Sequence, residues 1–486
     1  MVLSLKNSHW TYRDTVRRRD FLGSLTCLPA IVLACHFSGT TPEAPISILD
    51  YGARGQPGID DTLAFTRAIA AATSSRRGLY IPSGRYEVTQ IDVPSGLVSV
   101  EGPGWLVART GETAAVVRVS GNATHAVRGL RLSVNIDAAS IARRGVFCTG
   151  LVESQIVDCQ IVNLTHNDGD GIRISFPASR NNVIARNNVT LADVVNGTHP
   201  DGLRGIHIVG ETASPAGGID QTGSPVRVTN SVTGHQVLDN KVTGGTHGIA
   251  FFGSQDIEVR NNECRGQSAR NIIASPSVER GEIVANRCLE AGSSGIHLAD
   301  GTRMIKVHDN LVSSLRSGLT DDDDAAIQAY VGCRDIQIIG NEVRGDWRYG
   351  VAVTLVENVT VEQNRLIGPF RQASVAIESD YVGLQPPRDA PFARAREMPW
   401  RNALATRNIS LVDNDYGTAP IAIGLGQYRG RSLVGVTIHG GKFDDAVRPL
   451  AIYQDQPGAI TDLLVSNAAV RRDPRNLLHG LTIGPP

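Results

Sequence analysis

Apolar and polar residues follow one short pattern that recurs along most of this chain. The pattern is an apolar residue, two variable residues, an asparagine, one further variable residue and a second apolar residue. Its asparagines are Asn187, Asn240, Asn262, Asn286, Asn310, Asn341, Asn364 and Asn414, with intervals of 53, 22, 24, 24, 31, 23 and 50 residues. A second short apolar segment usually follows, as in HGIAFFG, SGIHLAD and YGVAVTL. The pattern predicts a repeat of 22 to 24 residues with three enlarged turns.

Two or three short strands in each repeat, with no helix between them, predict an all-β solenoid. Each strand would pair in parallel with its copy one turn later, about 4.8 Å away. The asparagines would then stack, because each amide can bond the next amide and the turn backbone, and asparagine tolerates the left-handed conformation. A leucine-rich solenoid is the rival, but the repeats lack its leucine framework. We therefore expect a right-handed parallel β-helix of about 10–12 coils.

The segment before the repeats carries a second, independent pattern. ILDYGARGQPGIDDTLAFTRAIAAA, followed by GLYIPSGRYEV, resembles the N-terminal segment of the pectate-lyase/rhamnogalacturonase-type β-helix superfamily. The resemblance covers roughly residues 46 to 90 and implies the fold, not a reaction. One departure is QPG at 56–58, where the family usually has Asp-Gly. Asp60 and Asp61 stand where a helix N-cap belongs, and the amphipathic helix after them would close the open end of the solenoid.

The N-terminus predicts an export signal. Arg18 and Arg19 precede a short apolar run, which resembles a twin-arginine signal and is too short to span a bilayer stably. The sequence IVLAC also resembles a lipoprotein processing site with Cys35 as lipid acceptor, although Leu33 is bulky for its place. We expect an export signal and linker at 1–40, the cap and first coils at 41–125, and the β-helix at 126–486 with inserted loops at 211–228 and 380–404. The mature protein would be periplasmic, secreted or lipid-anchored at the cell surface, with no transmembrane helix.

Composition excludes some partners. The 486 residues include 47 basic and 48 acidic ones, so a net charge of −1 provides no field that recruits nucleic acid. Among the cysteines, Cys264 and Cys288 would occupy neighbouring rungs, either as buried thiols or as a disulfide. No CxxC spacing indicates a zinc site. We expect a monomer without a cofactor, and calcium held by Asp321 to Asp324 is the one metal alternative.

Stacking the second strand of each coil brings distant polar residues together. One outward column would contain Arg173, His207, Ala250, Ile273, His297, Gln328 and Ala352. A second column, just before each strand, would contain Asp170, Arg204, His247, Arg270, Ser294, a residue near Ala325, and Tyr349. Two enlarged loops would wall a groove floored by His247, Phe252, Arg270, Ser294 and His297. Lids at the insertions would present Tyr381 and Trp400 to sugar rings, whereas His297 and His308 are expected to be ordinary surface positions.

This cluster favours an exported enzyme that cleaves or modifies an acidic polysaccharide. Its candidate catalytic residues are Asp168, Asp170, His199, Asp201, Arg204, His207 and His247, and its candidate substrate-binding residues are Arg173, Phe252, Arg270, His297 and Trp400. Hydrolysis needs two carboxylates, which Asp168, Asp170 and Asp201 can supply. β-Elimination needs a cation for the sugar carboxylate, Arg204 or Arg173, and a base, His199, His207 or His247. Epimerisation shares that first step.

The sequence favours a lyase slightly and leaves these reactions open. The Gly-His-Gly and Arg-x-Lys motifs of polygalacturonase-like hydrolases are absent in the expected order, so that mechanism is not carried over. The main alternative is a non-catalytic glycan-binding or surface scaffold protein.

Overall fold

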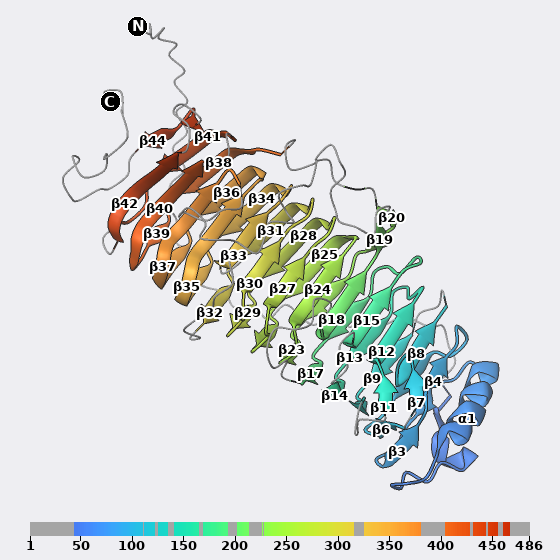
Figure 1. The fold of residues 1–486 in the computed structure, drawn as a ribbon. Coiled ribbons are helices and arrows are strands. Elements are labelled where there is room, and N and C mark those ends of the chain that lie inside the picture. The colour runs from blue at the N-terminus through green and yellow to red at the C-terminus, as the bar shows by residue number, and fades with distance from the viewer. Residues whose placement is uncertain are drawn as a thin grey trace, which may run out of the picture. The chain divides into compact units, whose positions relative to one another are not determined.

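The repeat seen in the sequence winds into a right-handed parallel β-helix, in which each coil lies on the one before it (Figure 1). The chain divides into Met1–Glu43 and Ala44–Pro486, and the elements of the fold belong to the second unit. The computed structural model describes residues 43–109, 111–121, 125–134, 140–164, 169–192, 202–212, 226, 228–314, 325–380, 404–427, 431–443, 446–454 and 460–466. The predicted export signal, Cys35, Asp321–Asp324 and the insertion at 381–403 lie outside these residues.

Two long parallel sheets form the sides of the solenoid. Within the described residues, one contains 17 strands (sheet A) and the other contains 23 (sheet B). The central strands of sheet A are β16 (Val183–Ala185), β22 (Gln236–Leu238), β25 (Ser254–Arg260), β28 (Glu279–Val284), β31 (Arg303–His308), β34 (Arg334–Ile339), β36 (Glu357–Glu362), β38 (Thr406–Val412) and β41 (Leu433–His439).

Sheet B contributes two segments to most coils. The first segments are β14 (Gln160–Leu164), β17 (Asn188–Leu191), β23 (Lys241–Thr243), β26 (Glu263–Arg265), β29 (Arg287–Leu289) and β32 (Leu311–Ser314). The second are β12 (Arg144–Thr149), β15 (Asp170–Ser175), β18 (Arg204–Val209), β24 (His247–Phe252), β27 (Arg270–Ala274), β30 (Ser294–Leu298) and β33 (Ala325–Tyr330). Toward the C-terminus both segments merge into β35 (Glu342–Thr354) and β37 (Arg365–Glu378), followed by β40 (Ala419–Gln427) and β42 (Ala446–Gln454).

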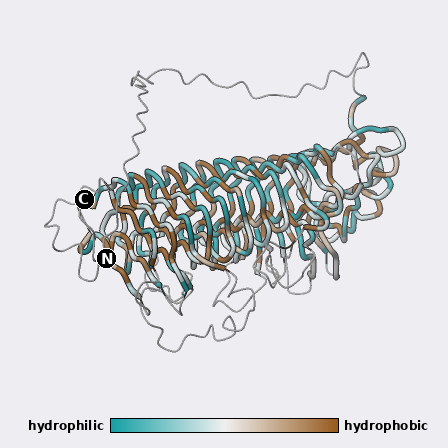
Figure 2. The backbone as a smooth tube through the Cα atoms, turned by 90° about the horizontal axis from the view of Figure 1, so that it is seen from above, coloured by the Kyte–Doolittle hydropathy of each residue, from teal (hydrophilic) through white to brown (hydrophobic). Residues whose placement is uncertain are grey.

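The core consists of aliphatic columns, because residues in register on successive rungs face the same way. Ile172, Ile206, Ile249, Ile272 and Ile296 pair in order along sheet B, and each is fully buried. Around each coil, hydrophobic residues alternate with hydrophilic ones (Figure 2). Burying such a side chain contributes about 1.5–3 kcal/mol, so these columns give the fold much of its stability.

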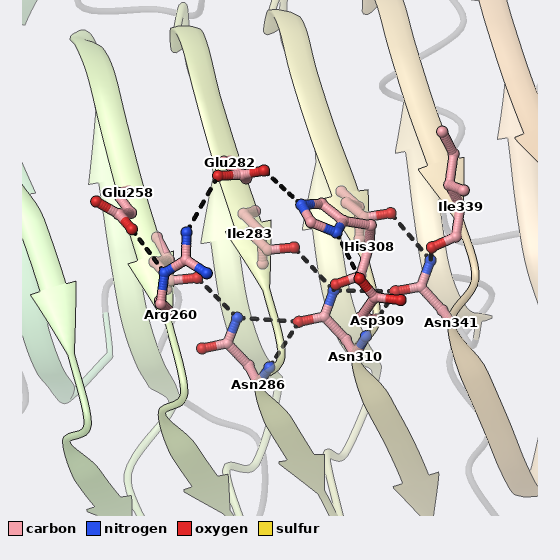
Figure 3. Close-up of polar contacts among 12 residues, drawn as sticks. Glu258, Arg260, Glu282, Ile283, Asn286, His308, Asp309, Asn310, Ile339 and Asn341 are labelled. Atoms are coloured by element: carbon pink, nitrogen blue, oxygen red, sulfur yellow. Dashed lines mark hydrogen bonds and ion pairs between the residues drawn. The ribbon is translucent and has the colours of Figure 1, made fainter. Parts of the chain in front are cut away.

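The predicted asparagine ladder is confirmed. From Asn187 to Asn414, each Nδ2 donates to the Oδ1 of the next asparagine at 2.9–3.0 Å. Each backbone N–H from Asn187 to Asn364 also donates to that same Oδ1. Figure 3 shows three consecutive members, Asn286, Asn310 and Asn341. The ladder thus satisfies buried turn backbone with buried side chains.

One detail of the ladder prediction is wrong. The ladder asparagines are not the left-handed residues; the residue before each of them is. These preceding residues are Arg186, Asp239, Asn261, Ala285, Asp309, Gly340, Gln363 and Asp413, with φ between 47° and 62°. The asparagine is therefore selected for its amide rather than for its backbone conformation.

The helix α1 (Thr62–Ser75) packs at the N-terminal end of the solenoid, as expected (Figure 1). Its buried face includes Phe65 and Ile69, which join the main core. The two aspartates before it divide the capping role. Asp60 accepts a hydrogen bond from the Thr62 N–H at 2.9 Å, whereas the buried Asp61 accepts from the N–H groups of Arg54 and Gly55. Asp61 is the N-cap residue by position, but its carboxylate fixes the preceding loop.

The cysteines decide between two alternatives left open by the sequence. Cys264 and Cys288 face each other in register on β26 and β29. Both are free and buried, as are Cys148, Cys159 and Cys333. The disulfide alternative for Cys264 and Cys288 is therefore wrong in this structure, and the two thiols act as small core residues.

Candidate functional site

The second strands of sheet B carry two outward columns of residues, the first polar and the second polar except at Ala250 and Ile273. In the first column, Asp170, Arg204, His247, Arg270 and Ser294 pair in that order. In the second, Arg173, His207, Ala250, Ile273 and His297 pair in the same way. The register agrees with the sequence-based stacking residue by residue.

Glycine makes the corner between the two columns. Gly171, Gly205 and Gly248 follow Asp170, Arg204 and His247, respectively. A Cβ at Gly171 or Gly205 would lie 2.5 or 2.2 Å from the inward-facing Val189 or Val242, respectively. A side chain at either of these two glycines would therefore overlap the core, although the matching position on β27 is Asn271. The two columns nevertheless lie on one outer face of the solenoid, because Arg173 and His207 of the second column contact Asp170 of the first.

Asp170 is the centre of an ion cluster on this face. Its side chain is fully buried, and Arg144 Nε and Arg173 Nη1 donate to Oδ2 at 3.1 and 3.3 Å. On the other oxygen, His207 Nδ1 lies 2.9 Å from Oδ1 and Arg204 Nη1 lies 3.9 Å from it. Burial alone would raise the pKa of Asp170, but His207, Arg173 and Arg204 together lower it below the usual range. The carboxylate is therefore ionised. Its two oxygens contact four side chains, Arg144, Arg173, Arg204 and His207.

His207 is held in one tautomer by this arrangement. An ionised carboxylate only accepts, so the proton of the imidazole lies on Nδ1 and the lone pair on Nε2. Burial lowers the pKa of His207 to about 4, with Arg204 and Arg173 adding to the effect and Asp170 opposing it. Its Nε2 is buried and has no hydrogen-bond partner among the described residues. The ring contacts Phe252 edge-on, with centroids 4.8 Å apart. This geometry gives a neutral imidazole that can accept a proton at Nε2.

His247 occupies the next rung of the first column. It is 6 % exposed, and its Nδ1 is buried without a hydrogen-bond partner in the described part of the chain. Burial, together with Arg270, Arg204, His297 and His207, lowers its pKa well below the usual value. Two neutral histidines thus lie on neighbouring rungs between arginines.

The remaining predicted residues are only partly brought together. Phe252 lies beside His207, and its ring is 5.6 Å from the Arg204 guanidinium carbon. His297 lies farther along its column, where Nδ1 is 2.8 Å from Gln328 Oε1. The expectation that His297 is an ordinary surface residue is wrong, since it is buried. Four candidates lie outside the described residues: Asp168, His199, Asp201 and Trp400.

The groove prediction also needs a correction. Its floor residues are in register, but Ser294 is fully buried and His247 and His297 nearly so, whereas Phe252 and Arg270 are partly exposed. The floor is therefore a mostly buried polar surface rather than an open, solvated one. The loops expected to wall it, at 193–201 and 315–324, lie outside the described residues. Of the insertion at 211–228, the ends pair as β19 (Glu211–Thr212) and β20 (Val228–Asn230).

Sequence reasoning missed Arg144, which donates to Asp170. It stands immediately before Gly145, just as Asp170 stands before Gly171, and it pairs with Asp170 on β12. Extending the first column by one coil would have found it. A second missed group lies near the C-terminal end of sheet B, where buried Glu378 is 3.4 Å from the Tyr349 hydroxyl. Burial raises the pKa of Glu378 to about 7. Six rungs, about 29 Å, separate its strand from that of His207.

The outer face of sheet A carries different chemistry. Alternating charges connect its strands, as in the chain from Glu258 through Arg260, Glu282 and His308 to Asp309 in Figure 3. Surface ion pairs of this kind contribute little each. Two shallow hollows on this face, around Asp256 and around Asn408, lie away from the histidine columns. The face is consistent with a solvated side of the solenoid.

The described residues do not form a metal centre. No group of three or more His, Cys, Asp and Glu side chains among them is arranged to hold a metal ion. At the histidine columns, the neighbouring side chains are mainly arginines, whose positive charge opposes a cation. No helix in the described part of the chain is long and apolar enough to cross a membrane.

Comparison with known proteins supports the fold class. The model of a family described as periplasmic copper-binding protein (NosD) matches residues 136–324 and, in a second match, residues 202–368. The described residues do not fit the copper site that this description implies. A search of curated proteins found no match.

Among solved structures, the chain is similar to DFA-IIIase from Arthrobacter chlorophenolicus A6. Without its lid, that enzyme has 14% identity and a TM-score of 0.52, covering 68% of this chain and 91% of its own. For a second structure of DFA-IIIase from the same organism, the TM-score is 0.51 at 14% identity, and the coverage is 78% of this chain and 94% of the other. The Azotobacter vinelandii mannuronan C-5 epimerase AlgE4 A-module has 14% identity and a TM-score of 0.48, covering 84% and 98%. At these identities the likeness is one of fold.

Proposed function

We propose that this chain is an exported enzyme that modifies an acidic polysaccharide by removing the proton at C5 of a uronic acid. The observation that carries the proposal is the pair of Asp170 and His207, with arginines on the same face. A carboxylate fixes the imidazole by one nitrogen and leaves the other nitrogen unpartnered, so that a proton can be accepted at that nitrogen. The substrate would present its C5–H to His207 Nε2.

The arginines argue for an anionic substrate. Arg144, Arg173, Arg204 and Arg270 lie along the same columns as a single described carboxylate, Asp170. Removing a proton next to a carboxylate builds negative charge on that carboxylate, and preorganised cations stabilise such charge in a site that excludes water. Elimination and epimerisation share this step. They differ in whether the leaving group at C4 departs or the proton returns from the other side.

Hydrolysis is less well supported by the described residues. A glycosidase needs a carboxylic acid that donates a proton and a second carboxylate that acts as base or nucleophile. The low pKa of Asp170 makes it a poor acid, and its four hydrogen-bonding or charged neighbours make it a poor nucleophile. We therefore favour proton abstraction, with elimination slightly ahead of epimerisation. A binding scaffold remains the alternative, because a cationic face can also hold an acidic glycan without reacting.

Export is proposed from the sequence signal, and the matching family model carries a periplasmic description. Secretion, the lipid anchor at Cys35 and the monomeric state stay predictions. Fractionation of cells that express the full chain would test the first two, and size-exclusion chromatography would test the third. Recovery of only unprocessed protein, in the cytoplasm, would contradict export.

A substrate panel tests the proposed reaction class. Purified mature protein would be incubated with polygalacturonate, alginate and a neutral glucan as control. Elimination gives unsaturated uronates that absorb in the ultraviolet, and epimerisation changes the C5 configuration in the proton NMR spectrum without cleavage. New reducing ends without ultraviolet absorbance would indicate hydrolysis and contradict the proposal. Binding of a polyuronate without any product would favour the scaffold.

A further inference from the structure

Three residues on consecutive rungs place an imidazole between two guanidinium groups. Arg204 on β18, His247 on β24 and Arg270 on β27 pair directly in register, so neighbours are about 4.8 Å apart. Arg204 and His247 are 7 % and 6 % exposed, and Arg270 is partly exposed. The group begins at Arg204, which also belongs to the Asp170 cluster, and continues along the same face of sheet B.

The His247 imidazole is built into this place without a complete set of partners. Its Nδ1 is buried and makes no hydrogen bond to any described residue. Buried polar atoms in folded proteins almost always have a partner, and each exception calls for an explanation, such as a functional role or a bound ion or water. The unpartnered nitrogen therefore marks a position where a bound group can contribute a hydrogen-bond acceptor.

Among the described residues, the charged and titratable groups that face His247 all oppose its protonation. They are Arg204 and His207 on β18, Arg270 on β27 and His297 on β30. The nearest described carboxylate, Asp170, lies one rung before Arg204 and contacts four side chains, Arg144, Arg173, Arg204 and His207. In the free protein His247 is consequently neutral. An anion bound between Arg204, His247 and Arg270 would raise the pKa of His247, because it would attract the protonated ring and accept a hydrogen bond from its N–H.

We propose that Arg204, His247 and Arg270 form a recognition site for the carboxylate of an acidic sugar, and that His247 takes up a proton when the ligand binds. The proposal rests on the proposed function for the identity of the ligand. It goes further by giving the two histidines different roles. His207 removes the proton from C5 of the substrate, and His247 recognises the negative charge of the substrate's carboxylate. The geometry does not require turnover, so a non-catalytic protein could bind in the same way.

A carboxylate suits this triad better than a neutral sugar. Guanidinium groups form paired, charge-assisted hydrogen bonds with planar carboxylates. A carboxylate bound by Arg204 and Arg270 would also provide an acceptor for the N–H of the His247 imidazole. An inorganic anion such as sulfate shares the charge but lacks the attached sugar ring. The ring of an acidic sugar would make additional contacts with neighbouring rungs. The acidic sugar should therefore bind more tightly than sulfate.

Because binding takes up a proton, the affinity for the ligand should fall as the pH rises. The pKa of His247 is low in the free protein and higher in the complex, because the bound anion favours the charged ring. Between those two pKa values, affinity falls by up to about tenfold for each unit of rising pH. A site made only of arginines would show no such slope over this range, since guanidinium groups stay protonated.

Calorimetric titration of the full mature protein tests the proposal. The ligand is trigalacturonate, and the controls are maltotriose and sulfate, each measured between pH 5 and 8 in buffers of different ionisation enthalpy. We expect trigalacturonate to bind with net uptake of up to one proton, and to bind more tightly than either control. Equal affinity for sulfate, or binding without proton uptake at every pH, would overturn the assignment. His207→Gln is included so that turnover does not obscure binding.

Two variants and a matched control localise the effect. His247→Asn keeps a hydrogen-bonding side chain but cannot titrate, so it should abolish both the proton uptake and the pH slope. Arg270→Gln should weaken binding about ten- to a hundredfold, the range for a lost charge-assisted hydrogen bond. Arg287→Gln is the control, because Arg287 is exposed and pairs with Glu263. Unchanged binding in both His247→Asn and Arg270→Gln would refute the site.

The readouts separate this proposal from the proposed function. Loss of turnover in His207→Gln with normal, proton-linked binding supports both. Proton-linked binding without turnover in the wild-type protein contradicts the enzyme but supports the recognition site. Turnover in the wild type with pH-independent binding supports the enzyme and overturns the recognition site. Circular dichroism of each variant confirms that the fold is intact before these comparisons are made.

Discussion

At the scale of single residues, Asp170 combines full burial with contacts to several positively charged groups. A buried charge is tolerated only with partners, and here Arg144, Arg173, Arg204 and His207 provide them. The same residue orients the proposed base. Stability and function therefore depend on one carboxylate, and its removal leaves several buried cations without compensation.

Asp170→Asn should destabilise the protein by about 3–5 kcal/mol, the cost of breaking a buried ion pair from one side. Asp158→Asn is the matched control, since Asp158 pairs with Arg186 at an exposed position. That change should cost at most about 1 kcal/mol. Chemical denaturation of both variants measures the difference. Similar stability losses would show that the Asp170 cluster is not the compensated network described above.

At the scale of elements, register determines both the core and the site. The sequence predicted the asparagine column and both outward columns because most repeats carry two recognisable landmarks, the Asn before the first segment and a second short apolar segment after it. It missed Arg144 and Cys159, whose coils lack the asparagine. The backbone N–H of Cys159 donates to Asn187 Oδ1, so this cysteine occupies the ladder position one coil earlier. A pattern defined by one residue type cannot detect a substitution within the column.

The sequence analysis also missed a stack of polar residues at the turn that precedes the strands of sheet A. His125, Ser154, Asn182 and His235 follow one another there, each backbone N–H bonding the next side chain. The four residue types differ, so no repeat is visible in the sequence. The chemistry that unites them, an acceptor at one fixed place in the turn, appears only in the structure.

Asn187→Ala tests the ladder. The change removes the acceptor for the buried Cys159 N–H and the donor to Asn240, and we expect a loss of about 2–3 kcal/mol in the free energy of unfolding. Asn188→Ala, at the next position, is the control because Asn188 is exposed and should change stability by less than about 0.5 kcal/mol. If urea denaturation gave equal effects, the ladder would not be a source of stability.

At the scale of the whole molecule, buried neutral histidines connect stability to pH. Burial lowers the pKa of His125, His207, His235 and His247, with His207 and His235 at about 4. The unfolded chain binds these protons near pH 6.5, whereas the folded chain does so only at lower pH. Their contribution is therefore fully present above pH 6.5 and is lost as the pH falls toward 4.

We expect the free energy of unfolding to decrease by several kcal/mol between pH 7.5 and pH 4.5. His235→Asn should reduce this decrease by about 2.5 kcal/mol, the linkage for one histidine shifted from 6.5 to about 4. An asparagine can still accept the Asn182 N–H, so the turn should be retained. Denaturant titrations at both pH values measure the effect. A protein equally stable at both would contradict the burial of neutral histidines.

The site is less predictable than the fold for a physical reason. Period and register follow from local sequence, but the segments that carry Asp168, His199, Asp201 and Trp400 contain no repeat and lie outside the described residues. What the columns establish is the identity of the residues on one face and their order. The proposed reaction follows from the charge and tautomer of Asp170 and His207 rather than from those loops.

The most direct test follows the hydrogen at C5 of a polyuronate in deuterated water, using wild type, His207→Gln and His439→Gln. His439 lies on β41 of sheet A and serves as the matched histidine control. We predict that wild type and His439→Gln remove the C5 hydrogen, either giving unsaturated ends or incorporating deuterium, and that His207→Gln does neither while still binding substrate. Undiminished C5 exchange or elimination in His207→Gln, or cleavage by the wild type that retains the C5 hydrogen, would contradict the account.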